Sequence, residues 1–445
     1  MVIIIPIEVK VRELLSKSFL AYKIKQSFNN CKIILGSQRD IFNRIKLLKN
    51  TIWLDKNTFY NKISKNKALR NNYKIMLDEE GPHSMHSKIY LDLRLNKKIL
   101  KFYDKIIFWG KNDLKKKQKN CYVFGHPKYD LLKKPYNEIF SKKIAEIKKK
   151  YKKNILIASS FEFDCLDERL EKRLIQINSS NKSAAEKYVS TKEKYFKNYE
   201  NQILLTKELA YKYPDVNIIY RPHPIQKIEL VKKRFGEIPK NLHIIFKDTI
   251  TPWIGGCEIY IHSGCSTYLE AYLLKKKIVN FFFTKIPEQE KFSYAGQTFY
   301  NTKECINYIK YIIDKKELSY KANKKINNIV FNLNKKKYFY KEFNTFLQNY
   351  KSINSKIIFG KNKKTIKDLF LLILSYIKNK IFLKTFLFYF MPEQWLYSKE
   401  HKLRKFNFLK KNELSKIINQ FYDLDKKKNI KPRIKYISKN VFMLH

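Results

Sequence analysis

The stretch VNIIYRPHP, from Val216 to Pro224, is a run of strand-forming residues that ends in a turn with two prolines. Each proline fixes its φ angle and lacks a backbone donor, so the turn is rigid. The stretch EIYIHSGCSTYLE, from Glu258 to Glu270, passes from a second apolar run through a glycine into hydroxyl residues that favour a helix start. A strand followed by a turn and a helix is the unit of a parallel sheet, so both stretches predict a doubly wound α/β domain.

Apolar, β-branched runs of the same kind recur along the chain in two series. The first series predicts strands over residues 2–5, 32–35, 52–54, 74–77, 105–108 and 122–124. The second predicts strands over residues 155–158, 216–220, 242–246, 258–261 and 277–282, with a long helix over 184–213. After the first strand, a helix is predicted that places five residues on one face, namely Val11, Leu14, Leu15, Ser18 and Tyr22.

A lysine-rich stretch, Lys133 to Lys153, separates the two series and has helix formers without a strand pattern. We therefore expect two Rossmann-type domains that face each other across a ligand crevice. The expected boundaries are 1–135 for the first domain, 136–153 for a linker helix, 154–350 for the second domain, and 351–445 for a basic, aromatic-rich helical extension.

The extension contains two apolar runs, Ile366 to Ile377 and Ile381 to Phe390, which lysines interrupt. Neither reaches the roughly 20 apolar residues that a membrane-spanning helix needs. Two interpretations stay open: the extension folds back on the domains, or it lies on a membrane surface. The amino terminus lacks the pattern of a signal peptide, and the six cysteines lack metal-ligand spacing, so we expect a cytoplasmic protein without a metal site.

The chain has 93 basic and 40 acidic residues, a net charge of +53, and 44% hydrophobic residues. The hydrophobic content is enough for a folded core, which excludes global disorder. Abundant Lys, Asn, Ile, Phe and Tyr are typical of AT-rich coding, which accounts for part of the charge. The rest favours an anionic membrane surface or a phosphorylated substrate. Nucleic acid is not expected, because the sequence contains no motif for binding it.

The turn after residue 220 predicts a phosphate site, since the carboxyl ends of parallel strands line the ligand crevice. Arg221 and His223 would contact phosphate oxygens there. The segment from His262 adds His262 itself as a contact to the donor, and Gly264, where backbone can approach a phosphate. Ser266 or Thr267 would cap a helix start that attracts anions, and both hydroxyls would lie at the donor. Glu270 would accept hydrogen bonds from a ribose or sugar hydroxyl. The alternatives are a structural ion pair for Arg221, a loop role for His223 and a capped helix without a ligand.

Acidic residues follow two predicted strands of the first domain. Glu8 and Arg12 come after the first strand, and Asp78, Glu79 and Glu80 come after the strand that ends at Leu77. One of these carboxylates is a candidate general base, because neighbouring carboxylates raise one another's pKa. A solvated acidic turn is the alternative. The segment GHPKYD, residues 125–130, is predicted to have a structural role near the hinge.

No dinucleotide-binding GxGxxG, P-loop, zinc-protease HExxH or hydrolase GxSxG motif is present. Taken together, several segments resemble the bacterial surface carbohydrate biosynthesis proteins, which are related to GT-B glycosyltransferases and to capsule and teichoic-acid polymer enzymes. The likeness lies in residues 5–14, 35–38, 78–81, 125–130, 221–224, 252–253 and 262–271, and it covers roughly residues 1 to 285.

This resemblance implies a GT-B architecture with an acceptor-binding first domain and a second domain that binds a nucleotide-activated donor. It implies a metal-independent glycosyltransferase of capsule or lipopolysaccharide type, with no cofactor, a nucleotide sugar as donor and a glycan or lipid-linked acceptor. A CDP-polyol phosphotransferase of the same architecture is the alternative. A non-catalytic protein that binds nucleic acid or, through residues 351–445, an anionic inner-membrane surface is the alternative from another class.

Overall fold

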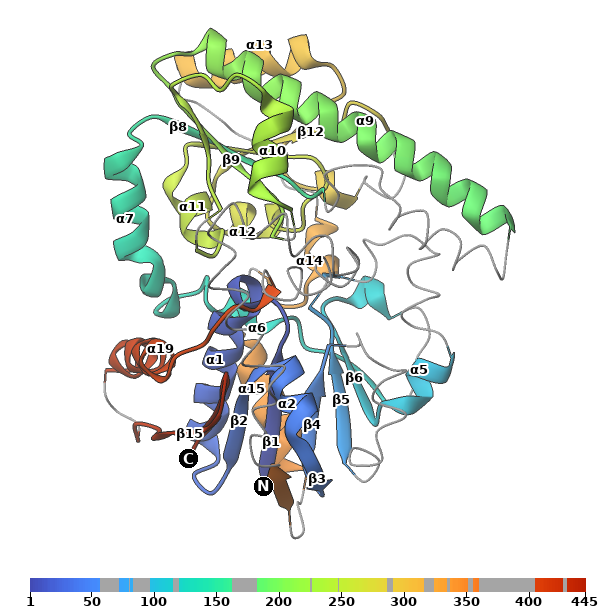
Figure 1. The fold of residues 1–445 in the computed structure, drawn as a ribbon, viewed down its shortest axis with the longest axis vertical. Helices are drawn as coiled ribbons and strands as arrows, with labels where there is room; N and C mark the ends of the chain where they lie inside the picture. Colours follow the sequence, from blue (N-terminus) through green and yellow to red (C-terminus); the bar gives the residue numbers. More distant parts are fainter. Residues whose placement is uncertain are drawn as a thin grey trace, which may run out of the picture.

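The computed structural model describes residues 1–56, 72–79, 81–82, 97–114, 120–161, 182–224, 226–246, 248–285, 291–315, 324–333, 337–350, 355–359, 405–426 and 430–445. These residues form two α/β domains, one above the other in Figure 1, each built on its own sheet. The predicted fold class of two Rossmann-like domains is confirmed.

The first sheet has eight strands in the order β15-β16-β2-β1-β4-β5-β6-β7. Its parallel strands are β1 (Val2–Ile7), β2 (Lys32–Ser37), β4 (Ile52–Asp55), β5 (Tyr73–Leu77), β6 (Lys105–Phe108) and β7 (Cys121–Val123). Its helices are α1 (Lys10–Ser27), α2 (Gln38–Arg44), α5 (Lys97–Phe102), η3 (Lys111–Asp113), α6 (Pro127–Asp130) and α15 (Phe339–Gln348). The central strand β1 is buried along its whole length, which matches its continuous run of apolar residues.

The second sheet has six strands in the order β10-β9-β8-β11-β12-β13, and all of its neighbouring strands are parallel. They are β8 (Asn154–Ala158), β9 (Asn217–Arg221), β10 (Leu242–Ile244), β11 (Ile259–His262), β12 (Lys277–Phe281) and β13 (Gln297–Phe299). The helices are α9 (Lys182–Lys212), α10 (Ile228–Phe235), α11 (Thr251–Gly256), α12 (Tyr268–Leu273), α13 (Thr302–Lys315) and α14 (Ile326–Ile329). All five strands predicted for this domain are present.

Two short elements connect the domains: η4 (Tyr136–Phe140) and α7 (Ser141–Lys150), where the linker helix was predicted. The chain also crosses back, because α14 lies against the first domain. Gly110 shows how close this approach is, since a Cβ there would lie 2.1 Å from the backbone oxygen of Ile329. One apolar cluster accordingly contains Trp109 of the first domain together with Tyr260 and Tyr268 of the second.

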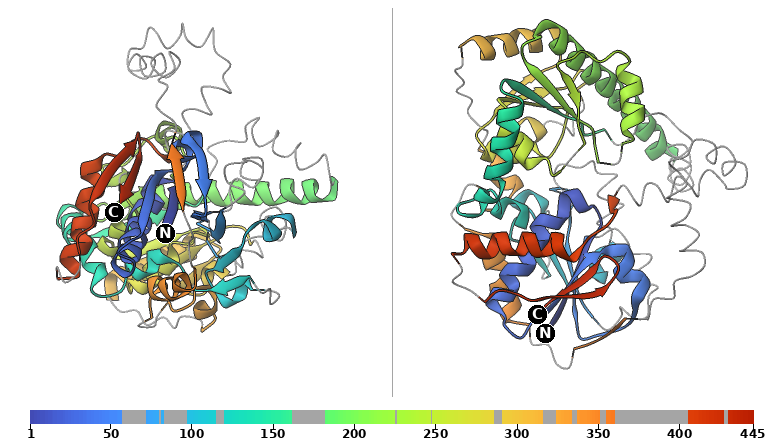
Figure 2. Two further views of the ribbon diagram at one scale, coloured as in Figure 1. Left: turned by 90° about the horizontal axis from the view of Figure 1, so that it is seen from below. Right: turned by 60° about the vertical axis from the view of Figure 1, so that its left-hand side comes forward.

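The carboxyl-terminal extension differs from the prediction. Residues 411–424 form a helix, α19 (Lys411–Leu424), but β15 (Ile434–Ser438) and β16 (Val441–Leu444) form a hairpin that adds two antiparallel strands to β2 (Figure 2). A further strand, β14 (Lys356–Phe359), pairs with β3 (Ile45–Lys49). The described part of the extension therefore folds back on the first domain. The runs 366–377 and 381–390 lie outside the described residues.

A close backbone contact explains why position 36, which lies next to this hairpin, is a glycine. A Cβ at Gly36 of β2 would lie 2.1 Å from the backbone oxygen of Asn440, which accepts a hydrogen bond from the Ser37 N–H at 2.9 Å. Asn440 has a φ of 60°, a value that asparagine adopts more readily than most residues. None of the described helices is long and apolar enough to cross a membrane.

We expect Phe442→Ala to lower the free energy of unfolding by about 3–5 kcal/mol, because the ring is 1% exposed within the core of the first domain. Lys435→Ala, on an exposed position of the same hairpin, should change it by less than about 0.5 kcal/mol. Urea unfolding followed by circular dichroism measures both. Equal effects would show that the hairpin is not part of the core.

Candidate functional site

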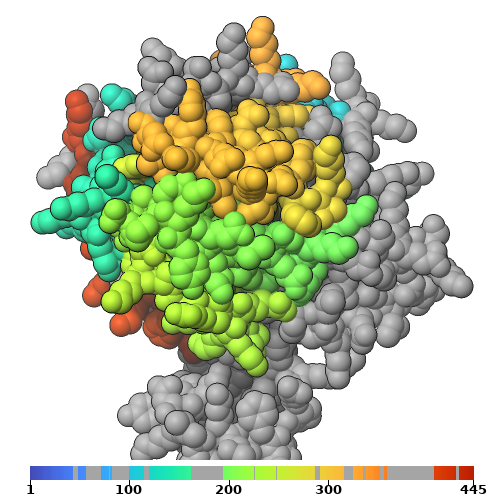
Figure 3. Space-filling model, turned by 90° about the horizontal axis from the view of Figure 1, so that it is seen from above, coloured from blue at the N-terminus to red at the C-terminus, as the bar shows by residue number. Residues whose placement is uncertain are grey.

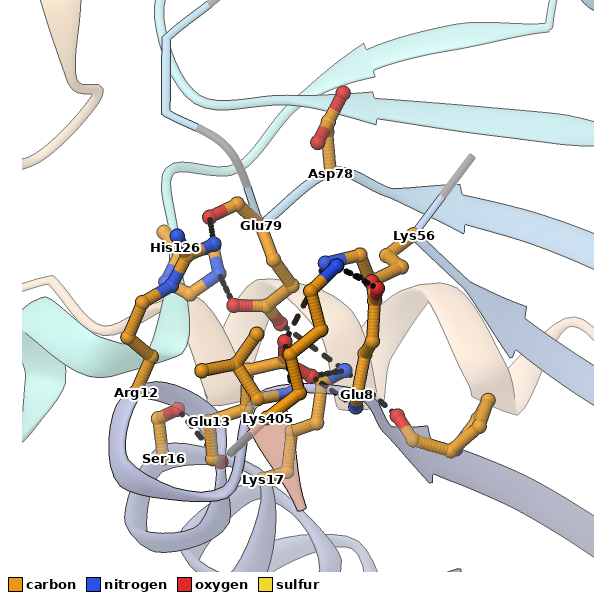
Figure 4. A network of polar contacts seen from close by, with 12 residues as sticks. Glu8, Arg12, Glu13, Ser16, Lys17, Lys56, Asp78, Glu79, His126 and Lys405 are labelled. Atoms are coloured by element: carbon orange, nitrogen blue, oxygen red, sulfur yellow. Dashed lines mark hydrogen bonds and ion pairs between the residues drawn. The ribbon is translucent and has the colours of Figure 1, made fainter. Parts of the chain in front are cut away.

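The carboxyl edge of the first sheet carries a group of charged side chains joined by ion pairs, which we call the Glu13 network (Figure 4). Its members are Glu8, Glu13, Lys17, Lys56, Glu79, His126 and Lys405. They come from the turns after β1, β4, β5 and β7, from α1, and from the carboxyl-terminal extension. Segments far apart in sequence meet here because parallel strands all end at the same edge.

Glu13 is the centre of the network and is fully buried. Its carboxylate accepts hydrogen bonds from the backbone N–H groups of Glu8 at 2.9 Å and Val9 at 3.0 Å. Val9 is the residue that precedes α1, and its own side chain makes no cap to the helix. The Glu13 carboxylate instead satisfies two backbone donors just before the helix.

Two buried lysines neutralise Glu13. The Lys17 Nζ lies 2.8 Å from one Glu13 oxygen and 3.4 Å from Glu79, and it donates to the Pro6 carbonyl at 2.7 Å. The Lys56 Nζ lies 3.5 Å from the other Glu13 oxygen. Burial by itself opposes ionisation of Glu13, but the two ammonium groups outweigh it and lower its pKa to about 2.

Glu8 is held between two lysines, with Lys56 at 2.6 Å and Lys405 at 2.7 Å. Burial works against its ionisation, yet the two ammonium groups keep the pKa of Glu8 below its ordinary value. A carboxylate stabilised in this way is a weak base. The geometry therefore does not favour the predicted role of Glu8 as the general base.

Glu79 is paired with a histidine. Its Oε2 lies 3.1 Å from the His126 Nε2, and the His126 Nδ1 accepts a hydrogen bond from the Lys128 N–H at 3.3 Å. Burial lowers the pKa of His126, so the neutral ring carries its proton on Nε2, toward Glu79. Because both ring nitrogens are engaged, this pair fixes the start of α6. The predicted structural role of residues 125–130 agrees with this geometry.

Asp78 lies beside the Glu13 network. Its side chain is fully buried and points away from the ion pairs in Figure 4. Its backbone oxygen accepts a hydrogen bond from the Trp109 Nε1 at 2.7 Å. Glu80, the third predicted carboxylate, lies outside the described residues, as does His83.

At the edge of the second sheet, Arg221 is the last residue of β9 and is only 5% exposed. Its Nη2 donates to the Asp248 carbonyl at 2.9 Å, and its guanidinium lies 5.3 Å from the centre of the Trp253 ring. Burial lowers the pKa of Arg221 to about 10, which leaves it charged at neutral pH. A backbone carbonyl and an aromatic ring therefore hold the guanidinium in place, and phosphate binding by this residue stays a prediction.

His223 is more accessible than Arg221, since it is only partly buried. Gln226 fixes the turn: its Oε1 accepts from the His223 N–H at 2.9 Å, and its own N–H donates to the His223 carbonyl at 2.9 Å. The Gln226 Nε2 donates to the Tyr199 hydroxyl at 3.1 Å. The two prolines and Gln226 together hold His223 at the carboxyl edge of β9.

His262 differs from its predicted role as a direct contact to the donor, because the ring is fully buried. Its Nδ1 accepts from the N–H groups of Gly264 and Cys265, both at 3.2 Å, and the ring stacks between Tyr260 and Tyr268. Burial lowers the pKa of His262 to about 3, so the ring is neutral. His262 shapes the turn by using backbone donors that were predicted to bind phosphate.

The other predicted residues of this turn are placed near its surface. Gly264 has a φ of 84°, a conformation that only glycine adopts readily, and Ser266 and Thr267 are partly buried. Thr267 is the residue before α12 but makes no side-chain cap; its hydroxyl bonds to the Tyr260 hydroxyl and lies 2.8 Å from the Cys265 Sγ. The predicted cap was Ser266 or Thr267, and Thr267, which stands at the cap position, does not act as one.

Glu270 joins the two domains. It is 6% exposed; one carboxylate oxygen accepts from the Thr251 hydroxyl at 2.5 Å, and the other lies 3.5 Å from the Lys128 Nζ. Lys128 belongs to α6, which follows β7, whereas Glu270 belongs to α12, which follows β11. The carboxyl edges of the two sheets therefore meet at this contact, and Figure 1 shows α6 and α12 between the sheets. A sugar-hydroxyl contact for Glu270 stays a prediction.

Among the described residues, no three His, Cys, Asp or Glu side chains gather where they could hold a metal ion. A surface depression lies between α9 and α13, on the face shown in Figure 3, and is lined by Glu208, Tyr211, Lys212, Lys303, Ile306 and Asn307. It is remote from both carboxyl edges, and its lining includes no histidine.

No known protein family has a model that matches this chain. No curated protein matches it either. Among solved structures, the fold is similar to that of UDP-GlcNAc 2-epimerase from Neisseria meningitidis bound to UDP-GlcNAc, with a TM-score of 0.49 and 13% identity over 78% of this chain and 100% of that chain.

Two further similar structures are those of S. aureus MnaA with UDP and of the wall teichoic acid polymerase TagF. The first has a TM-score of 0.48 and 12% identity over 78% of this chain and 96% of that chain. The second has a TM-score of 0.49 and 11% identity over 78% of this chain and 88% of that chain.

The sequence located both edges but missed the residues that organise them. Glu13, Lys17, Lys56 and Lys405 were not predicted as site residues. Glu13 and Lys17 do leave a signal, because a charged pair four residues apart lies beside the apolar face of α1. No signal in the sequence connects Lys405 with Glu8, since 397 positions separate them.

Glu13→Gln should flatten the acid dependence of stability. The folded pKa of Glu13, about 2, lies below its ordinary value of 4.5, so its contribution is complete above 4.5 and is lost as the pH falls to about 2. At pH 7 the substitution should cost about 3–5 kcal/mol, because Lys17 and Lys56 would stay buried while each loses one of its carboxylate partners. Urea midpoints measured across this pH range test both effects.

The control is Glu413→Gln, which breaks an ion pair with Lys10 at a side chain that is 40% exposed. It should cost less than about 1 kcal/mol and leave the pH profile unchanged. If the Glu13 variant kept the acid slope of the unsubstituted protein, the network would not be the origin of that slope.

Proposed function

We propose that this chain is a transferase of GT-B architecture that transfers a sugar from a nucleotide-activated donor during the assembly of a surface polysaccharide. The observation that carries the proposal is the meeting of two carboxyl edges at the contact between Lys128 and Glu270. Ligands of open α/β sheets bind at such edges. Two facing edges suit a reaction between a donor held by one domain and an acceptor held by the other.

Within this proposal, the second domain binds the donor at the turn of residues 221–226 and at the loop of residues 262–267. The loop exposes Ser266 and Thr267 in part, and Gly264 gives it a conformation that allows close approach of a ligand. Transfer forms a bond between an acceptor oxygen and the anomeric carbon. It breaks the bond from that carbon to the diphosphate, which leaves as a nucleoside diphosphate.

We propose that His223 is the general base that removes the proton of the acceptor hydroxyl. Glu8 and Glu79 are held ionised by lysines, and His126 has both nitrogens engaged. His223 is partly exposed on a turn that prolines and Gln226 make rigid. A histidine is the side chain most often used as a general base near neutral pH. Asp78, buried beside the Glu13 network, is the second candidate for this role.

A CDP-polyol phosphotransferase is the second candidate function, and the basic composition of the chain favours it as much as it favours sugar transfer. In that reaction the acceptor oxygen attacks the outer phosphorus of the donor. The bond between the two phosphates breaks, and a nucleoside monophosphate leaves. The two reactions therefore release different nucleotides from donors of the same general kind.

The purified protein should bind nucleoside diphosphates and turn over one class of donor. Isothermal titration with UDP, CDP, UDP-GlcNAc and a CDP-polyol measures binding, and chromatography of the released nucleotide identifies the reaction. Release of a diphosphate supports sugar transfer, whereas release of a monophosphate supports polyol phosphate transfer. Failure to bind any of these nucleotides would contradict both.

His223→Ala should lower the turnover number by about 100- to 10,000-fold, the usual contribution of a general base, with little change in donor affinity. His243→Ala, on β10, removes a histidine that bonds to Asn217 within the sheet and should leave turnover nearly unchanged. Steady-state kinetics and titration separate the two effects. A loss of donor affinity without a loss of turnover would assign His223 to phosphate binding instead.

A further inference from the structure

Lys128 is placed where a ligand of both domains would lie. Its ammonium group is 5.0 Å from the centre of the Trp109 ring and 4.9 Å from that of Tyr129, and its side chain is 21% exposed. The 3.5 Å distance to Glu270 is longer than a strong charge-assisted hydrogen bond, which is about 2.7–2.9 Å. This cation is thus positioned by two aromatic faces and only loosely paired with a carboxylate.

Tyr129, the next residue, carries a buried polar group. Its side chain is 2% exposed, and among the described residues its hydroxyl makes no hydrogen bond. An unpaired buried hydroxyl costs about 1–3 kcal/mol, so such groups usually meet a ligand or a water molecule. Burial, and then the nearby Glu270 carboxylate, raise the pKa of Tyr129 well above its usual value. The hydroxyl therefore keeps its proton and is available to donate.

The rest of the first edge holds these two residues in place. His126 accepts from the Lys128 N–H and is itself fixed by Glu79, which Lys17 connects to Glu13. The His126 ring also lies on Trp109, with 4.3 Å between the ring centres. The Glu13 network thus positions α6 against the second domain without using either the Lys128 ammonium or the Tyr129 hydroxyl.

We infer that Lys128 and Tyr129 of the first domain bind the phosphate groups of the donor that the second domain holds. An ammonium group and a neutral phenol are both donors, and phosphate oxygens are acceptors. On binding, Lys128 exchanges the Glu270 carboxylate for a phosphate, while Glu270 keeps the Thr251 hydroxyl as its partner. The inference rests on the proposed function, and it adds that donor binding draws on both domains.

The test compares the affinities of Lys128→Met and Tyr129→Phe for UDP and uridine, measured by isothermal titration. Lys128→Met keeps the apolar stem and should weaken UDP binding by about 10- to 100-fold, the usual effect of a lost charged hydrogen bond. Tyr129→Phe removes only the hydroxyl and should weaken it by about 3- to 10-fold. Binding of uridine, which has no phosphate, should not change. Lys128→Arg should recover much of the affinity, because it restores a cationic donor.

Two controls separate a loss of ligand binding from effects of net charge and of stability. Lys142→Met, at an exposed position of α7, changes the net charge equally and should leave UDP affinity unchanged. Tyr129→Phe should be at least as stable to urea as the unsubstituted protein, which separates a ligand-binding hydroxyl from a structural one. If the unsubstituted protein binds UDP and both variants bind it equally well, this inference is wrong and the proposed function stands. If the unsubstituted protein binds neither UDP nor CDP, the proposed function itself fails.

Discussion

The buried carboxylate of Glu13 supports most of what lies at the first edge. It satisfies two backbone donors just before α1, and it neutralises Lys17 and Lys56. Through Lys17 it is connected to Glu79, and through Lys56 to Glu8. Buried ions persist only where partners and hydrogen bonds compensate for lost hydration, so these residues depend on one another. A substitution at Glu13 would therefore disturb the contacts at the carboxyl ends of β1, β4 and β5.

The network also explains how residues that do not touch a ligand can shape the place where one would bind. His126 connects Glu79 to the backbone of α6. It thereby fixes the positions of Lys128 and Tyr129, which belong to that helix. In the second domain, His262 and Gln226 have the corresponding role. Each uses its side chain to hold a turn, one by accepting backbone N–H groups and the other by bonding to both sides of the His223 backbone.

The carboxyl-terminal extension belongs to this arrangement. Its hairpin extends the first sheet beside β2, its helix α19 contributes to the first core, and Lys405 reaches Glu8. A second attachment lies at the far end of α1, where Lys23 meets Asp425 at 2.6 Å among aromatic rings that include Tyr136 and Tyr340. The described residues from Lys405 onward thus complete the first domain, because residues 1–135 alone would leave β2 as an exposed edge strand and one Glu8 oxygen without Lys405.

The sequence by itself determined the two parallel sheets, because strand-length apolar runs followed by turns leave few other folds, and it located both carboxyl edges. It could not determine which polar residues at those edges are free to act. Arg221 and His262 seemed suited to a phosphate, yet tertiary contacts occupy both, and Lys128, predicted as structural, is the cation between the domains. The physical reason is that local pattern fixes where a strand ends, whereas burial and pairing depend on segments such as residues 405–445 that are distant in sequence.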